Sequence, residues 1–161
     1  PMIVPLIITA AGMFFFYSQL GLTHTFTGLI LAHTALGTPF VVITVTATLT
    51  GFDTNLIRAS QSLGADTLRT FFKVIMPLIL PGVISGALFA FITSFDEVVV
   101  VLFIGSIEQV TIPKQMWAGL RQETSPVILS MATCLVLLSI ALLTTVELLR
   151  RRSERLRGIK V

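Results

Sequence analysis

The side chains that could carry chemistry are few, and the most unusual are two adjacent carboxylates. Asp96 and Glu97 are the only charged residues in the apolar stretch 78–104. A charge near the centre of a lipid bilayer costs about 2.5–3.5 kcal/mol even on a lenient insertion scale. The two side chains would also point about 100° apart on a helix. Because carboxylates are so costly in lipid, we expect these two to lie in the protein interior or in contact with water. There Asp96, with or without Glu97, is expected to attract a cationic solute. Two alternatives stay open: a position near the outer membrane interface, or pairing with a basic residue of a partner subunit.

Other residue types argue against an enzyme. The sequence contains no phosphate-binding loop of the form GxxxxGK[ST], so we expect no ATP binding by this chain. Its two histidines, His24 and His33, and its one cysteine, Cys134, are far apart and form no metal-ligand cluster. We predict no catalytic residue, no metal and no cofactor. We interpret His33 as a packed structural histidine, with a pathway-lining role as the alternative.

The elements around these residues belong to a membrane protein. Of 161 residues, 54% are hydrophobic and 12% charged, against about 25% charged in an average soluble domain. Mean hydropathy is +0.94, and the first charged residue is Asp53. A soluble fold needs polar side chains along its whole length. We predict an all-α integral membrane protein with lipid as its surroundings.

Four apolar runs are long enough to be spans, each of which needs about 20 residues. We expect spans at about 2–18, 26–50, 78–104 and 127–149, all in one transmembrane domain over residues 1–161. The sequence opens on Pro1, directly inside an apolar run. We therefore expect it to be a piece of a longer protein.

Residues 53–73 differ sharply from their apolar surroundings and show the pattern of two short helices. Asp53 or Thr54 can cap the first helix, Gly64 suits a left-handed stop, and Asp66 can cap the second helix. Four apolar residues fall near helical spacing, which predicts one apolar face. They are Leu56, Ile57, Ala59 and Leu63.

The basic residues indicate orientation. Nine of the eleven lysines and arginines lie in the 53–73 segment or in the tail 150–161, which fall on one side if four spans alternate. The positive-inside rule places both segments in the cytoplasm, so the C-terminus is expected there. Membrane topology thus accounts for the basicity, and we expect no nucleic-acid partner.

The 53–77 segment resembles the EAA loop of type I ABC importer permeases. That motif reads Glu-Ala-Ala, three residues, Gly, nine residues, then Ile-x-Leu-Pro. Ala59, Gly64 and Pro77 match it outright at the same spacing, and Val74 and Met76 are mild apolar exchanges. Arg58 stands where the family has glutamate. This departure puts in doubt any salt bridge that the glutamate makes to an ATPase.

The resemblance implies a fold and a set of partners. The chain would be the last four of six spans, with a cytoplasmic helix–turn–helix coupling loop at about 53–77. It would be an inner-membrane permease subunit that pairs with an identical or different second permease. A cytoplasmic ABC ATPase dimer and a periplasmic or lipid-anchored substrate-binding protein would complete the importer. The implied ATPase-coupling residues are Leu56, Arg58, Ala59, Ser60, Leu63, Gly64, Ala65 and Pro77.

Later segments are similar to the polyamine (putrescine/spermidine) branch of that family. The similarity lies in Leu80-Pro81-Gly82, in the Ser-x-Asp-Glu patch at 94–97 and in the segment Ile112–Trp117. It implies a solute pathway through Ser94, Asp96 and Glu97 and transport by alternating access. Related branches carry other solutes, so the solute is left open.

Two other functions remain possible. The chain could belong to an ATP-independent channel or secondary carrier, in which Asp96 and Glu97 couple ions and the loop is a connector. The absence of an inverted repeat between the halves argues mildly against a carrier of the inverted-repeat type. It could also be a membrane anchor without a pathway. The spacing of the loop motif favours the importer.

Overall fold

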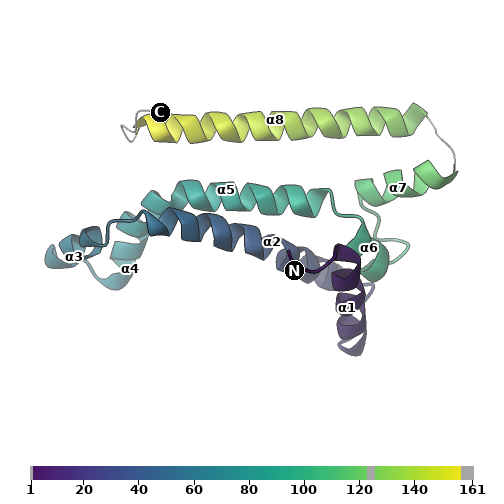
Figure 1. Cartoon of the computed structure of the whole chain (residues 1–161), viewed down its shortest axis with the longest axis horizontal. Coiled ribbons are helices and arrows are strands. Elements are labelled where there is room, and N and C mark those ends of the chain that lie inside the picture. Colours follow the sequence, from purple (N-terminus) through teal and green to yellow (C-terminus); the bar gives the residue numbers. More distant parts are fainter. Residues whose placement is uncertain (1, 123–125, 157–161) are drawn as a thin grey trace. The chain divides into compact units, whose positions relative to one another are not determined.

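The computed structural model describes residues 2–122 and 126–156, and that part of the chain is helical without strands (Figure 1). The helices are α1 (Leu6–Gln19), α2 (Phe26–Thr50), α3 (Asn55–Ser62), α4 (Thr67–Thr70), the π-helix η1 (Phe71–Ile75), α5 (Met76–Phe95), α6 (Val99–Ile104), α7 (Ile112–Gln122) and α8 (Pro126–Leu156). The prediction of an all-α fold is confirmed.

The chain divides into two compact units. The first contains Ile30–Asp96 together with the N-terminal residues up to Thr9. The second contains Ala10–Leu29 and the chain from Glu97 onward.

In the described part of the chain, three helices are long and apolar enough to cross a membrane. They are Phe26–Thr50, the continuous helix Thr67–Phe95 and Pro126–Thr145. The apolar helix α1 is shorter, with 14 residues. The predicted spans at 26–50 and 127–149 coincide with two of these helices. The run predicted at 2–18 becomes helical only from Leu6, where the Pro5 carbonyl accepts the N–H groups of Ile8 and Thr9.

In the first unit, α2 and α5 lie side by side (Figure 1). Small residues allow the two backbones to approach closely, as is common between helices in lipid. A Cβ on Gly37 would lie 2.9 Å from the Ala90 Cβ. Side chains on Gly82 or Gly86 would collide with Thr48 or Thr44.

The hairpin, defined here as residues 53–70, connects α2 to α5 through α3 and α4. Two of its predicted features are confirmed: Gly64 has φ +84°, and the Asp66 Oδ1 accepts the Arg69 N–H at 2.7 Å. At the first helix Asp53 accepts the Asn55 N–H at 2.9 Å, while Thr54 is the N-cap residue without a side-chain cap bond. A side-chain cap therefore begins α4, a turn at Asp53 precedes α3, and the positive φ of Gly64 makes the turn between them.

The span predicted at 78–104 does not coincide with one continuous helix. Helical backbone begins at Thr67 and runs through η1 into α5, which ends at Phe95. A new helix, α6, begins at Val99. The cause of the break is Glu97, whose carboxylate accepts the N–H groups of Val99, Val100 and Val101 at 3.0, 2.7 and 3.4 Å. These are groups that a continuous helix would bond to its own backbone.

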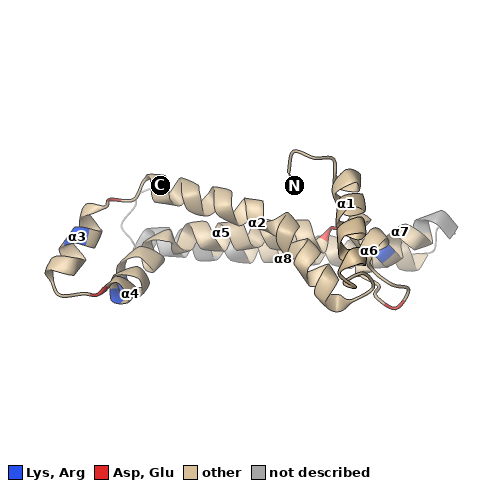
Figure 2. Cartoon of the chain, turned by 90° about the horizontal axis from the view of Figure 1, so that it is seen from below, with Lys and Arg blue, Asp and Glu red and all other residues tan. Residues whose placement is uncertain are grey.

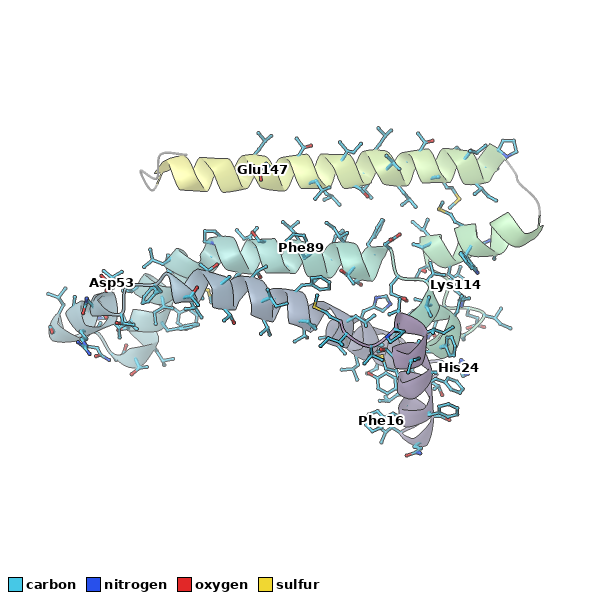
Figure 3. All side chains as sticks on the ribbon, viewed as in Figure 1. Phe16, His24, Asp53, Phe89, Lys114 and Glu147 are labelled. Carbon is cyan, nitrogen blue, oxygen red and sulfur yellow. The ribbon has the colours of Figure 1, made fainter. Side chains whose placement is uncertain are left out.

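In the second unit, hydrogen bonds fix the loop after α6. The His24 N–H donates to the Ile104 carbonyl at 2.8 Å, and the Lys114 ammonium donates to the carbonyls of Ser106 and Gln109 (Figure 3). Further on, α8 continues to Leu156, past the predicted end of the last span at 149. The predicted basic tail 150–161 is thus helical as far as Leu156, and its last residues lie outside the described part.

Candidate functional site

Two candidate sites lie in the first unit: the hairpin at one end, and Asp96 at the other end of α5. Charged residues of this unit gather on the hairpin, whereas α2 and α5 are uncharged along their lengths (Figure 2). α5 has 20 residues, so Asp96 lies about 30 Å from its start at a rise of 1.5 Å per residue. The two candidate sites are therefore about one membrane thickness apart.

One face of α3 is apolar and exposed. Leu56 and Ala59 in α3 and its C-cap residue Leu63 follow helical spacing i, i+3, i+7 and are all exposed, Leu63 to 88%. On α4, Leu68 is also 69% exposed. Arg58 is exposed as well, on another side of α3. A short helix with an exposed apolar stripe can bind in a groove of another protein.

The neighbouring face of α3 packs inward, toward α4. Ile57 and Ser60 are half-buried, and the Ser60 hydroxyl lies 2.9 Å from that of Thr70, which is 2% exposed. The Ala65 N–H donates to the Ser60 carbonyl at 3.1 Å. Of the predicted coupling residues, Ser60 and Ala65 thus hold the hairpin together instead of joining its exposed face.

Pro77 lies in the first turn of α5, directly after the π-helix η1. Proline has no N–H and its ring crowds the carbonyl four residues earlier, here that of Lys73. π-helices are rare and occur mostly as single turns inside α-helices, as here. The predicted motif proline therefore lies just after the π-helical turn that connects the hairpin to α5.

At the far end of α5, Asp96 is exposed and is the C-cap residue of the helix. Two residues earlier, the Ser94 hydroxyl lies 2.9 Å from the His33 Nδ1, which joins α5 to α2. The prediction of His33 as a packed histidine agrees with this contact and with its half-buried position. An exposed carboxylate at the carbonyl end of a helix favours a cation.

Glu97 differs from Asp96 in burial and bonding. It is 5% exposed, and its carboxylate is occupied by the three N–H groups at the start of α6. The adjacent carboxylates therefore do not form a paired site. Of the two, Asp96 is the exposed carboxylate.

No group of three His, Cys, Asp or Glu residues within 2–122 and 126–156 is arranged to hold a metal ion. Thr70 and His33 make contacts that the sequence did not indicate. Ser60 and Thr70 are ten residues apart, and His33 and Ser94 are 61 apart. No spacing rule predicts either contact, because each depends on how two helices pack.

Comparison with known proteins identifies the protein family of this chain. A family model described as "Binding-protein-dependent transport system inner membrane component" matches residues 1–155. The spermidine/putrescine transport system permease protein PotC of Haemophilus influenzae is 32% identical over 153 residues, covering 95% of this chain and 60% of the relative. PotC of Escherichia coli K12 is 31% identical over 150 residues, 93% of this chain and 57% of the relative.

A third relative has a narrower name. The putrescine transport system permease protein PotI of Escherichia coli K12 is 32% identical over 106 residues, covering 66% of this chain and 38% of the relative. The chain spans about three-fifths of the length of the first relatives it matches.

Proposed function

This chain belongs to the family of binding-protein-dependent transport system inner-membrane components, and from that premise we propose that it is a permease subunit of an ATP-driven ABC importer for polyamines such as putrescine and spermidine. The observation that carries the proposal is the hairpin, a charged helical pair between two helices, α2 and α5, that are long and apolar enough to cross a membrane. The motif residues Ala59, Gly64 and Pro77 lie in it or at its junction with α5.

In this proposal a cytoplasmic ABC ATPase dimer binds the exposed face of α3. Leu56, Ala59 and Leu63 would enter a groove on the ATPase, and Arg58 would meet its rim. ATP binding and hydrolysis take place in that partner. This chain makes and breaks no covalent bond; its hairpin passes the displacement to α5, and alternating access follows.

The proposed membrane arrangement has four spans in one domain: α1 with its flanking residues, α2, Thr67–Phe95 and α8. The 14 residues of α1 cover about 21 Å, less than the ~30 Å hydrocarbon core, so residues 2–5 and 20–22 must contribute to its crossing. With the basic hairpin in the cytoplasm, the C-terminal tail lies there too, after two further crossings. A second permease subunit would complete the pathway.

The proposed solute contact is on the side of the membrane opposite the hairpin. Asp96, exposed at the end of α5, would attract an ammonium group as the solute arrives from a substrate-binding protein. Ser94 would line the same end of α5, held toward α2 by His33. Glu97 follows Asp96 in the sequence and caps the start of α6.

Two measurements on the complete protein test the function. Affinity purification in mild detergent, followed by mass spectrometry, is expected to retain a P-loop ATPase. Radiolabelled putrescine uptake in a strain lacking its own polyamine importers should require ATP and that ATPase. Recovery of the protein alone after crosslinking, with uptake independent of ATP, would overturn the proposal in favour of a channel or secondary carrier.

A further inference from the structure

The inference concerns the contact that joins the two helices of the hairpin. The hydroxyls of Ser60 on α3 and Thr70 at the end of α4 are 2.9 Å apart. Thr70 is 2% exposed in a hairpin whose other residues are mostly exposed. A hydrogen bond between a half-buried and a buried hydroxyl in so open a segment is a specific contact between α3 and α4.

The direction of this hydrogen bond follows from proton counting. The Ser60 hydroxyl has one hydrogen, which it donates to the Ile57 carbonyl at 2.9 Å within its own helix. Its oxygen can still accept, so the Thr70 hydroxyl donates to Ser60. Thr70 thus supplies the proton that links α4 to α3, and Ser60 is the acceptor that α3 holds in place.

Thr70 is also the last residue before the π-helix. Its side chain is bonded to α3, while its backbone continues without interruption through η1 into α5. Displacement of α3 can therefore reach α5 through the turn around Gly64, through the packing of α3 against α4 and η1, and through the direct side-chain contact at Thr70. The turn is held by backbone hydrogen bonds from the N–H groups of Gly64 and Ala65 to the carbonyls of Gln61 and Ser60, and the Ser60–Thr70 bond adds a side-chain contact beyond them.

We propose that the Ser60–Thr70 hydrogen bond is the positioning contact that makes α3 and α4 move as one body, so that displacement of α3 by the ATPase reaches α5. This inference rests on the proposed function. Without the bond, α3 could follow the ATPase by opening the Gly64 turn while α5 stays in place. ATP would then be hydrolysed with less transport.

The test uses the complete transporter in proteoliposomes, with its ATPase and binding protein, and measures putrescine uptake per ATP hydrolysed. Thr70→Val keeps the shape and removes the donor. We expect ATP hydrolysis to persist and uptake per ATP to fall about fivefold, the scale of one neutral hydrogen bond. Thr70→Ser, the matched control, keeps the hydroxyl and should retain the wild-type ratio.

A double variant separates the bond from the cost of unpaired polar groups. Ser60→Ala alone leaves the Thr70 hydroxyl without its acceptor, whereas Ser60→Ala combined with Thr70→Val removes both hydroxyls. The proposal expects uptake per ATP to stay low in the double variant. A return to the wild-type ratio there, or no change in Thr70→Val, would overturn it.

Two further outcomes are informative. If Thr70→Val and the double variant fail to assemble while Thr70→Ser assembles and couples normally, the contact serves folding alone and the proposal is overturned. If the wild-type protein itself shows no ATP-driven uptake, the proposed function fails. A coupled wild-type transporter with unaffected variants refutes only the inference.

Discussion

The Oγ of Ser94 lies 2.9 Å from the Nδ1 of His33, and this contact joins α5 to α2 two residues before the exposed carboxylate of Asp96. A polar contact between two apolar helices restricts their rotation about each other. It therefore fixes the direction in which the end of α5 presents Asp96. The proposed solute contact depends on this pair as well as on the carboxylate.

The pair should stabilise the protein measurably but modestly. Hydrogen bonds between membrane helices average about 0.6 kcal/mol in double-mutant cycles. We expect a coupling of that size between Ser94→Ala and His33→Ala in the free energy of unfolding, measured by titration with denaturing detergent. The cycle isolates this pair from every other contact of His33. Strict additivity of the two substitutions would contradict the contact.

Asp96→Asn tests the solute site. The substitution removes the charge and keeps the shape, so we expect the apparent KM for putrescine to rise about tenfold, in line with the roughly 1.5–3 kcal/mol of a charged hydrogen bond. The amount of assembled complex should not change, because Asp96 is exposed. Glu108→Gln, at another exposed carboxylate, is the matched control. Unchanged uptake affinity and rate in Asp96→Asn would refute the assignment of Asp96 as the solute contact.

Glu97 should behave differently from its neighbour. Glu97→Ala removes the acceptor for three N–H groups, and we expect a loss of about 1–2 kcal/mol in stability, as for other helix caps. Hydrogen exchange should accelerate at the amides of Val99, Val100 and Val101. Uptake should fall through the amount of folded protein, with the KM for putrescine unchanged. A KM increase equal to that of Asp96→Asn would instead show that Glu97 contacts the solute.

The contrast between these carboxylates shows where sequence reasoning ends. The apolar run 26–50, the caps at Asp66 and the turn at Gly64 depend on neighbours in sequence, and each was predictable. The end of α5 was not, because hydropathy cannot distinguish a charged residue inside a helix from one that caps the next helix. The loop motif likewise indicated Ser60 without revealing that it bonds to Thr70.

Gly64 provides a test of the hairpin turn itself. Its φ of +84° is unfavourable for a residue with a Cβ, although a side chain there would meet nothing within 4 Å. Gly64→Ala should therefore cost roughly 1–2 kcal/mol through backbone strain alone. Gly12→Ala, in the middle of α1 with equally open surroundings, is the control and should be neutral or stabilising. Thermal unfolding of the two purified variants checks the difference, and equal melting temperatures would refute it.

Leu63→Asp tests the proposed ATPase-binding face. Leu63 is 88% exposed, so a charge there should leave the thermal stability of the permease unchanged. Buried in a groove of the ATPase, however, the carboxylate would lose its hydration without gaining a partner. We expect the amount of ATPase retained in mild detergent to fall about tenfold or more, as at interface hot spots.

Gln61→Asp is the matched control: it places the same charge on another side of α3 and should retain the ATPase. Equal retention in both variants would show that the exposed apolar face is not where the ATPase binds. Equal loss would show that any added negative charge on α3 has this effect, which would make the hairpin's electrostatics, and Arg58 in particular, the basis of the interaction.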